Sequence, residues 1–432
     1  MEKSKVDVIL GLQWGDEGKG KFVDVLTPKY DIIARFQGGP NAGHTLEFNG
    51  TKHVLHTIPS GIFHPEKVNL IGNGVLIDAY ILMKEISLLR EKGVEPSERM
   101  KISDKANLIL PTHRILDAAM EQSKGAAKIG STVKGIGPTY TDKAARCGLR
   151  VKDILSPNFI SKYEKLRAQH IQMLKDMHFD LASHQIENMS VDAYEEAWMA
   201  GIEEMRHFEI IQSEYYINDA LAKGLKVLAE GAQGSLLDVD FGSYPFVTSS
   251  NTTTAGVCSG LGVAPSNIGK VYGVFKAYCT RVGSGPFPTE LFDAEGDKLR
   301  KEGREFGSTT GRPRRCGWLD LPALYYAIML DGVTDLIVTK SDVLNTFERI
   351  RLCDGYVLGD KKMNVFPSTD EMENIDLSYI DMPGWETSLE GLTSYESLPQ
   401  ALRTYLEFIE NKTKKKISIV STGPDRSQTI LR

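Results

Sequence analysis

The sequence lacks the features that mark several large classes of protein. No apolar run approaches the ~18 residues of a membrane-spanning helix, and the first residues, MEKSKVDVIL, show no signal-peptide pattern. The five cysteines include no C-x-x-C pair, which argues against a disulfide framework or a zinc site. A formal net charge of −6 argues against a general nucleic-acid binder. We therefore expect a cytoplasmic protein with reduced cysteines and with neither a membrane nor a nucleic acid as a partner.

Short apolar runs rich in β-branched residues recur along the 432 residues and are expected to be strands. They show little alternation of polar and apolar residues, as do strands that are covered on both faces. The runs cover residues 6–12, 31–36, 68–72, 226–229, 271–280, 336–339, 350–353 and 417–421. Helical patterns separate several of them, so we expect an α/β protein with a mainly parallel central sheet flanked by helices.

Two regions carry the clearest helical patterns. Apolar spacing predicts a helix over residues 77–92 that stops at Gly93, a natural helix terminator. Residues 159–177 and 191–223 together predict a long, charge-rich helical block. We expect a single domain over residues 1–432, in which this block forms a helical insertion at roughly 156–224.

Three unusual loops each follow an expected strand directly. They are QWGDEGKGK at 13–21, TKSD at 339–342 and STGPD at 421–425. Open α/β sheets bind their ligands at the carboxyl ends of the strands. The sequence therefore predicts that loops from both ends of the chain form one site.

The first loop has the composition of a phosphate-binding loop. Gly15, Gly18 and Gly20 let the backbone approach a ligand closely, and Lys19 and Lys21 supply positive charge. A helix that starts near the second lysine would favour phosphate oxygens at its N-terminus. The alternative is a surface glycine turn with solvated charges. The loop also holds two carboxylates, and it lacks the Ser or Thr that usually follows the lysine.

The second loop matches the strand-terminal Asn/Thr-Lys-x-Asp that reads guanine in GTP-binding proteins. Asp342 would accept hydrogen bonds from the ring N–H and the exocyclic amine, a pair of donors that adenine cannot supply. The stem of Lys340 would cover the plane of the base. Four residues can also match by chance. Together with a phosphate loop, however, the match indicates a GTP site.

Two further segments carry candidate site residues. In FQGGPNAGHTL (36–46), Asn41 can read a base edge and His44 can donate a proton near neutral pH, although a lone histidine is often only a packed residue. In FGSTTGRPRRCGWLD (306–320), hydroxyl and guanidinium groups gather, which suits a substrate carboxylate or phosphate. The alternatives for that segment are a solvated basic loop or a nucleic-acid patch. The acidic balance of the chain and the absence of aromatic residues interleaved with the basic ones argue against the patch.

The chain resembles the adenylosuccinate synthetase family over residues 6–426. The resemblance rests on the five segments above and on long blocks in the family's order, among them GIGPTYTDKAARCGLRV, EGAQGSLLDVDFGSYPFVTSSN and TRVGSGPFPTEL. It implies a P-loop-NTPase-like α/β fold with helical subdomain insertions. It also implies a ligase that joins IMP and L-aspartate at the expense of GTP, giving adenylosuccinate, GDP and phosphate, in the committed step from IMP towards AMP.

The resemblance implies chemical roles for four residues. Asp16 would remove the N1 proton of IMP, so that the 6-oxygen attacks the γ-phosphate of GTP and forms 6-phosphoryl-IMP. His44 would donate a hydrogen bond or proton to the transferring phosphoryl group, and Lys19 would stabilise that group electrostatically. Asp16 and the backbone oxygen of Gly43 would bind one Mg²⁺ per subunit, which explains a carboxylate inside a phosphate loop. The amine of aspartate would then displace phosphate.

The resemblance also implies three sets of binding residues and a homodimer in which Arg146 reaches the IMP phosphate of the other subunit. The GTP set is Gly15, Asp16, Glu17, Gly18, Lys19, Gly20, Lys21, Gly43, His44, Thr45, Arg314, Lys340, Ser341, Asp342, Ser421, Thr422 and Gly423. The IMP set is Asp16, Asn41, Ala42, Gly43, His44, Thr132, Arg146, Gln233, Thr248 and Arg312. The aspartate set is Ser308, Thr309, Thr310, Arg312 and Arg314.

Two other classes of protein share part of this pattern. A GTP-binding regulatory switch predicts Ser or Thr after the loop lysine and no loop for a second substrate. A simple GTP-using kinase would share the carboxylate base but would not need the cluster at 309–315. Gly20 after Lys19, together with that cluster, favours the ligase. The chain departs from common family patterns at Val133 and Lys134, where Gly-Arg is usual, and at Pro313.

Overall fold

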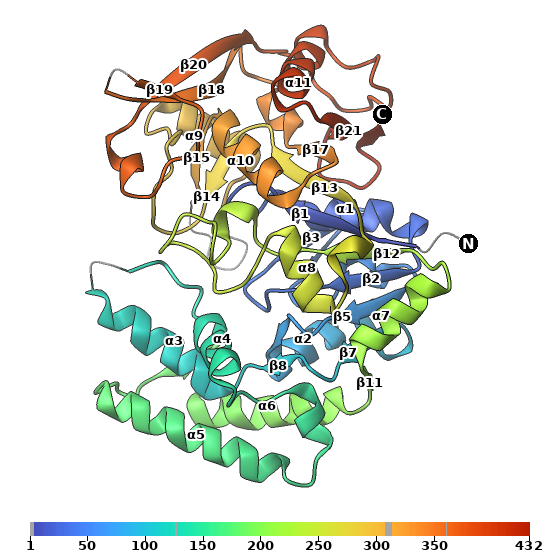
Figure 1. Ribbon diagram of the computed structural model, residues 1–432, viewed down its shortest axis with the longest axis vertical. Coiled ribbons are helices and arrows are strands. Elements are labelled where there is room, and N and C mark those ends of the chain that lie inside the picture. Colours follow the sequence, from blue (N-terminus) through green and yellow to red (C-terminus); the bar gives the residue numbers. More distant parts are fainter. Residues whose placement is uncertain (1–3, 126–127, 307–312, 360) are drawn as a thin grey trace.

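The computed structural model describes residues 4–125, 128–306, 313–359 and 361–432. Within those ranges, the largest sheet has ten strands in the order β11-β7-β5-β2-β12-β1-β13-β17-β21-β22, and it runs through the middle of the molecule (Figure 1). Each neighbouring pair is parallel except β21 and β22. The mainly parallel central sheet predicted from the sequence is therefore confirmed.

The strands of this sheet have the following bounds. They are β1 (Val6–Gly11), β2 (Ile32–Arg35), β5 (Val68–Ile71), β7 (Met100–Ser103), β11 (Glu209–Ile211), β12 (Val227–Glu230), β13 (Ile268–Lys276), β17 (Asp335–Thr339), β21 (Lys416–Ser421) and β22 (Thr429–Leu431). The shorter pairings among the described residues use β3 (His44–Phe48), β4 (Thr51–Leu55), β6 (Leu76–Ile77), β8 (Asn107–Leu108), β9 (Gln185–Ile186), β10 (Met189–Ser190), β14 (Cys279–Arg281), β15 (Arg315–Gly317), β16 (Leu319–Asp320), β18 (Arg349–Leu358), β19 (Lys361–Met363) and β20 (Asp376–Pro383).

Helices cover the sheet and form a separate layer beside it. Their bounds are α1 (Lys19–Leu26), α2 (Ala79–Arg90), α3 (Pro111–Ser123), α4 (Ile136–Ala145), α5 (Phe159–Asp176), α6 (Val191–Met205), α7 (Ser213–Ala222), α8 (Thr254–Leu261), α9 (Ala294–Gly303), α10 (Leu321–Asp331) and α11 (Gln400–Thr413). In Figure 1, α3, α4, α5 and α6 lie together at the bottom of the view, away from the sheet. Helix α3 contacts each of the other three.

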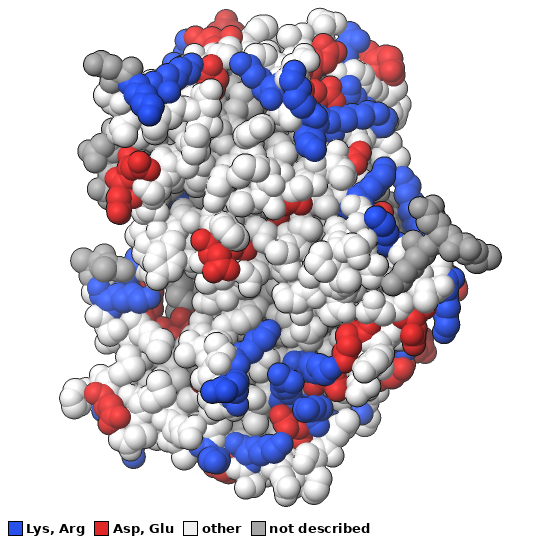
Figure 2. Space-filling view, viewed as in Figure 1, with Lys and Arg blue, Asp and Glu red and all other residues white. Residues whose placement is uncertain are grey.

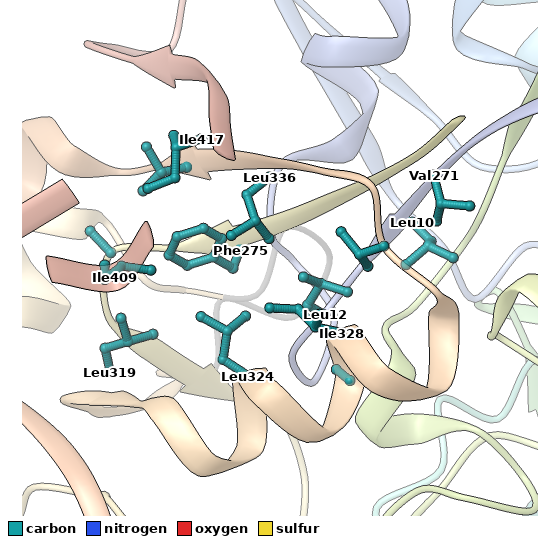
Figure 3. Packing of buried hydrophobic residues seen from close by; sticks show 14 of the residues in the cluster. Leu10, Leu12, Val271, Phe275, Leu319, Leu324, Ile328, Leu336, Ile409 and Ile417 are labelled. Atoms are coloured by element: carbon teal, nitrogen blue, oxygen red, sulfur yellow. The ribbon is translucent and has the colours of Figure 1, made fainter. Parts of the chain in front are cut away.

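The main core explains why the central strands read as nearly continuous apolar runs. In Figure 3, Phe275 of β13 and Leu336 of β17 lie beside Leu324 of α10 and Ile409 of α11. All four side chains are almost fully buried. Removing a side chain of this size from water contributes about 1.5–3 kcal/mol. The packing holds β1, β13, β17 and β21 as a rigid base for the loops that leave their carboxyl ends.

Two expectations about secondary structure are wrong in detail. The helical pattern at 191–223 is interrupted, because β11 separates α6 from α7 and pairs with β7 at the edge of the sheet. The run at 350–353 does form a strand, β18, but that strand pairs with β16, β19 and β20 in a smaller sheet. Propensity in a short segment cannot show which partner the segment finds. The single domain and the insertion at 156–224 stay predictions.

A buried polar cluster joins three helices of the lower layer. The Nε2 atoms of His113 (α3) and His170 (α5) each lie 2.9 Å from Oδ2 of Asp142 (α4). The backbone N–H of Leu110 donates to Nδ1 of His113 at 2.9 Å, and Nδ1 of His170 lies 2.7 Å from Oγ1 of Thr112. Each ring thus has a partner on both nitrogens, and the carboxylate connects the three helices.

This cluster makes stability depend on pH in the acid range. Burial lowers the pKa of His113 to about 4, an effect that His170 reinforces and Asp142 opposes. The unfolded chain, whose histidine pKa is about 6.5, therefore binds this proton more tightly than the folded protein. The contribution to stability is present above pH 6.5 and is lost as the pH falls towards 4. We expect a slope of up to about 1.4 kcal/mol per pH unit in that window.

Urea unfolding between pH 8 and pH 4 measures this slope. The matched variant is His113→Asn. Its amide oxygen can still accept the N–H of Leu110, but the side chain at position 113 no longer titrates between pH 4 and pH 8. We expect a shallower pH dependence for the variant. Equal slopes for the two proteins would contradict the assignment to His113.

Candidate active site

The three loops that follow β1, β17 and β21 line one cavity. Its volume is ≈ 1690 Å³. The predicted site residues that line it are Gly15, Asp16, Glu17, Gly18, Lys19, Gly20, Lys21, Asn41, Ala42, Gly43, His44, Thr45, Thr132, Gln233, Thr248, Arg314, Lys340, Asp342, Ser421 and Gly423. Segments more than 400 residues apart in the sequence are therefore brought together at the carboxyl edge of the sheet.

The remaining predicted residues lie elsewhere. Ser341 and Thr422 are buried in the two later loops. Arg146 is exposed and follows α4, and it is not among the residues that line the cavity. Ser308, Thr309, Thr310 and Arg312 lie outside the described residues.

Lys21 binds the first loop to the last. Its Nζ donates to Oγ of Ser421 at 2.8 Å, to the backbone oxygen of Gly423 at 2.7 Å and to that of Gln428 at 2.8 Å. Burial lowers the pKa of Lys21 to about 7 against the opposing effect of Asp342 and two other carboxylates. The ammonium group, expected from the sequence to serve GTP, thus holds two loops of the cavity in contact.

Glu17 stabilises the first loop from behind. Its fully buried carboxylate accepts the N–H of Gln13 at 3.1 Å and of Gly15 at 2.9 Å, and it pairs with Nζ of Lys19 at 2.7 Å. A Cβ on Gly11 would lie 2.1 Å from Oε2 of Glu17, so glycine is required there. One of the two carboxylates in the phosphate-type loop is therefore structural, and it satisfies backbone donors instead of facing a ligand.

Asp16 is the carboxylate that faces the cavity. It adopts a left-handed backbone conformation (φ 60°), and 35% of its side chain is exposed. Nε of Arg314 lies 2.8 Å from Oδ2 of Asp16, while Nη1 of Arg314 donates to Oε2 of the buried Glu305 at 2.8 Å. One guanidinium thus joins the first loop to Glu305, which follows α9.

Gly20 shows why no Ser or Thr follows the loop lysine. Helix α1 packs against β3 at this point, and a Cβ on Gly20 would lie 2.9 Å from Cβ of His44 and 3.4 Å from Oγ of Ser60. A hydroxyl-bearing side chain does not fit in that space. The close approach brings His44 to the start of α1, beside the loop that carries Asp16.

His44 is held by a buried carboxylate that the sequence reasoning did not single out. Nδ1 of His44 contacts Oε1 of Glu230, the last residue of β12. Glu230 also accepts the backbone N–H of Ser60 at 2.8 Å and its hydroxyl at 2.6 Å. Burial lowers the pKa of His44, and the carboxylate opposes that effect. The only sequence signal was an acidic residue at the end of an apolar strand, next to the block EGAQG.

The loop after β17 contributes its carboxylate, Asp342, to the lining of the same cavity. Lys340 adopts a left-handed conformation (φ 60°), and its Nζ donates to the backbone oxygen of Gly303 at 2.9 Å. Burial raises the pKa of Asp342, while Lys340 opposes that effect. The acceptor and the lysine stem of the predicted guanine motif therefore lie in the same cavity as Asp16.

Comparisons with known proteins agree with this geometry. The family model of adenylosuccinate synthetase matches residues 8–430. The chain is 58% identical over 430 residues to adenylosuccinate synthetase of Bacteroides fragilis (99% of each chain), and 57% identical over 428 residues to that of Porphyromonas gingivalis (99% of each chain). The structure of fully ligated adenylosuccinate synthetase from Plasmodium falciparum matches with a TM-score of 0.91 at 36% identity, covering 99% of this chain and 100% of the other.

The chain belongs to the adenylosuccinate synthetase family. It is a GTP-dependent ligase that joins IMP and L-aspartate by way of 6-phosphoryl-IMP in the synthesis of AMP. The family uses GTP as a co-substrate and Mg²⁺. No helix among the described residues has both the length and the apolar character needed to span a bilayer.

Two further observations suit an adenylosuccinate synthetase that binds small molecules. Among the described residues, Oδ1 of Asn41 and Nε2 of Gln233 are buried without a hydrogen-bond partner, and both residues line the cavity. Such atoms are costly unless a ligand satisfies them. On the described part of the face in Figure 2, acidic and basic side chains are interspersed instead of forming a basic stripe.

Of the departures from common patterns of the adenylosuccinate synthetase family, Lys134 and Pro313 have local partners, whereas Val133 occupies a disfavoured backbone conformation. Val133, which stands where glycine is usual, has a left-handed backbone (φ 53°) that disfavours a β-branched residue. Lys134 pairs through Nζ with Glu187, which also accepts from Arg114 at 2.7 Å. Pro313 forms an isolated bridge with Phe306.

Proposed function

We propose that Asp16, His44 and Lys19 carry out the phosphoryl transfer of this ligase. The supporting observation is that Asp16 lines the same cavity as Lys19 and His44 and pairs there with Arg314. As a base, Asp16 removes the N1 proton of IMP, and the 6-oxygen attacks the γ-phosphate of GTP. Lys19 stabilises the charge on the transferring group, and His44 donates to it. The aspartate amine then displaces phosphate.

We propose that the cavity binds its three substrates side by side. Guanine lies against Lys340 and Asp342, and the phosphates extend to the loop at 13–21. IMP lies between Asn41, Gln233 and the segments around Thr132 and Thr248. Arg314 binds aspartate together with the segment at 308–312. The expected GTP contacts of Ser341, Thr422 and the other loop residues remain predictions, as does a cytoplasmic location.

A divalent cation fits the donors that the first two loops offer. The carboxylate of Asp16 and the backbone oxygen of Gly43 both line the cavity, and both are hard oxygen donors of the kind Mg²⁺ prefers. We propose that these residues hold one Mg²⁺ per subunit. The ion would neutralise the charge that builds up when phosphate oxygens approach Asp16.

The function is tested by mixing the protein with GTP, Mg²⁺ and IMP and then adding L-aspartate. We expect an ultraviolet change from IMP to adenylosuccinate only when all four components are present, with GDP and phosphate formed in equal amounts. A regulatory switch would hydrolyse GTP slowly whether or not IMP is present. A kinase would consume GTP and IMP without aspartate, and either result would overturn the proposed roles.

We further propose a homodimer in which each Arg146 completes the IMP site of the other subunit. The support is that Arg146 is exposed beyond α4 and absent from the lining of the cavity in its own chain. Mixing Arg146→Leu, whose binding of IMP should be weakened, with the inactive variant Asp16→Asn should then restore activity, because each hybrid dimer contains one intact site. Random exchange predicts recovery of about a quarter of the wild-type activity.

The matched control mixes Asp16→Asn with a chain that carries both changes. Every dimer in that mixture lacks the base in both of its sites, so we expect no recovery. If the first mixture also stays inactive after native mass spectrometry has confirmed subunit exchange, the shared site is wrong.

A further inference from the structure

The cluster of His113, Asp142 and His170 lies outside the cavity and takes no part in the chemistry above. Its three potential ligand atoms lie within 4.8 Å of one another, a spacing that would suit a metal ion. The hydrogen bonds of His113, however, are incompatible with metal binding by its Nε2 atom. Nδ1 of His113 accepts the N–H of Leu110, so the proton of the neutral ring must be on Nε2. An Nε2 that carries a proton donates to Asp142 and cannot ligate a cation.

Asp142 connects this cluster to the turn that carries Arg146. Its side chain is held by the two imidazole groups. Its backbone oxygen accepts the N–H of Cys147 at 3.1 Å and of Gly148 at 3.2 Å, and it also caps the N–H of Arg146. One residue therefore fixes the end of α4 from both its side chain and its main chain.

The conformation of Arg146 itself requires such support. Its φ of 65° lies in the left-handed region, which a non-glycine residue occupies only where its surroundings hold it there. The side chain is exposed, so burial of the guanidinium does not provide that support. The hydrogen bonds to the oxygen of Asp142 hold the backbone instead.

We propose that His113, Asp142 and His170 are positioning residues that aim Arg146 at the IMP phosphate in the other subunit. This inference rests on the proposed role of Arg146. The cluster anchors α4 to α3 and α5. Through the backbone carbonyl of Asp142 it also sets the direction in which the side chain of Arg146 extends from the end of α4. Bidentate recognition of a phosphate depends on that direction.

The test compares Asp142→Asn, Arg146→Ala and the double variant in the full-length enzyme. For Asp142→Asn we expect the KM for IMP to rise about tenfold, the effect of weakening one charge-assisted hydrogen bond. The KM for GTP and kcat at saturating IMP should stay within about twofold. In the double variant, the change at Asp142 should add nothing to the effect of Arg146→Ala, because both act through one side chain.

Asp176→Asn at the exposed end of α5 is the matched control, because it makes the same charge change without touching the cluster. A KM for IMP unchanged by Asp142→Asn, or effects that multiply in the double variant, would overturn the inference. If Asp142→Asn lowers the melting temperature too far for kinetics, His170→Gln provides the same comparison.

Hydrogen exchange separates this inference from the proposed role of Arg146. If the cluster holds the turn, the amides of Cys147 and Gly148 exchange faster in Asp142→Asn than in wild type or in Asp176→Asn. Unchanged exchange overturns the inference whatever the kinetics show. Faster exchange together with an Arg146→Ala enzyme of normal IMP affinity means that the turn is held as described but that Arg146 does not bind the substrate, so the proposed role fails.

Discussion

Replacing Asp16 with asparagine is expected to lower kcat by at least about a thousandfold, because it removes the base and weakens a metal ligand together. Binding of GTP should stay measurable, since the glycine-rich backbone and Asp342 are unchanged. Arg314 loses one partner but keeps its 2.8 Å bond to Glu305, so the described residues 313–320 should stay in place. Steady-state kinetics with IMP, GTP and aspartate, together with calorimetric titration of GTP, measure both effects.

The control for this experiment is Asp219→Asn, which makes the same charge change at an exposed position on α7. It should leave kcat unchanged within about twofold. Turnover by Asp16→Asn at a rate near that of wild type would show that another group removes the N1 proton.

Replacing Glu230 with glutamine should lower kcat about a hundredfold, with little change in the KM values. The amide can still accept one hydrogen bond from Nδ1 of His44, but it cannot stabilise positive charge on the ring as that ring donates to the phosphoryl group. The amide nitrogen then faces the backbone N–H of Ser60, which loosens the orientation of the histidine.

A double variant with His44→Ala decides whether Glu230 acts through the histidine. If it does, Glu230→Gln costs nothing further once the imidazole is gone. Losses that multiply would mean that Glu230 supports the fold through Ser60 instead. The melting temperature of each variant shows directly whether stability has changed.

Much of the fold could be predicted because its strands are covered on both faces. Burial on both sides demands long apolar runs such as β1 and β17, and these are visible in a single sequence. The short edge strand β11 was missed, because three residues between two helices carry too little pattern. The placement of β18 in a second sheet depends on pairing with β20, whose residues lie 19 to 34 positions further along the chain (Val357↔Asp376 to Arg349↔Pro383), and local patterns cannot show such a pairing.

The loops of the candidate site could be predicted from the sequence, but the roles of its buried carboxylates could not. Glycines and a lysine after an apolar strand indicate a phosphate loop, since few other functions need that combination. The sequence could not show that Glu17 is buried while Asp16 is partly exposed in the cavity. That difference depends on the space that Gly11 leaves behind the loop. The role of Glu230 was hidden for the same reason: its partner His44 lies 186 residues away.

The bond between Lys21 and the final loop has a consequence for how the molecule is made. The ammonium group emerges from the ribosome early, but its three acceptors at Ser421, Gly423 and Gln428 are synthesised about four hundred residues later. Until then, Lys21 of the nascent chain lacks these three acceptors, and the last loop that lines the cavity does not yet exist. The contacts that join the first loop of the cavity to the last therefore cannot form until residues 421–428 have been synthesised.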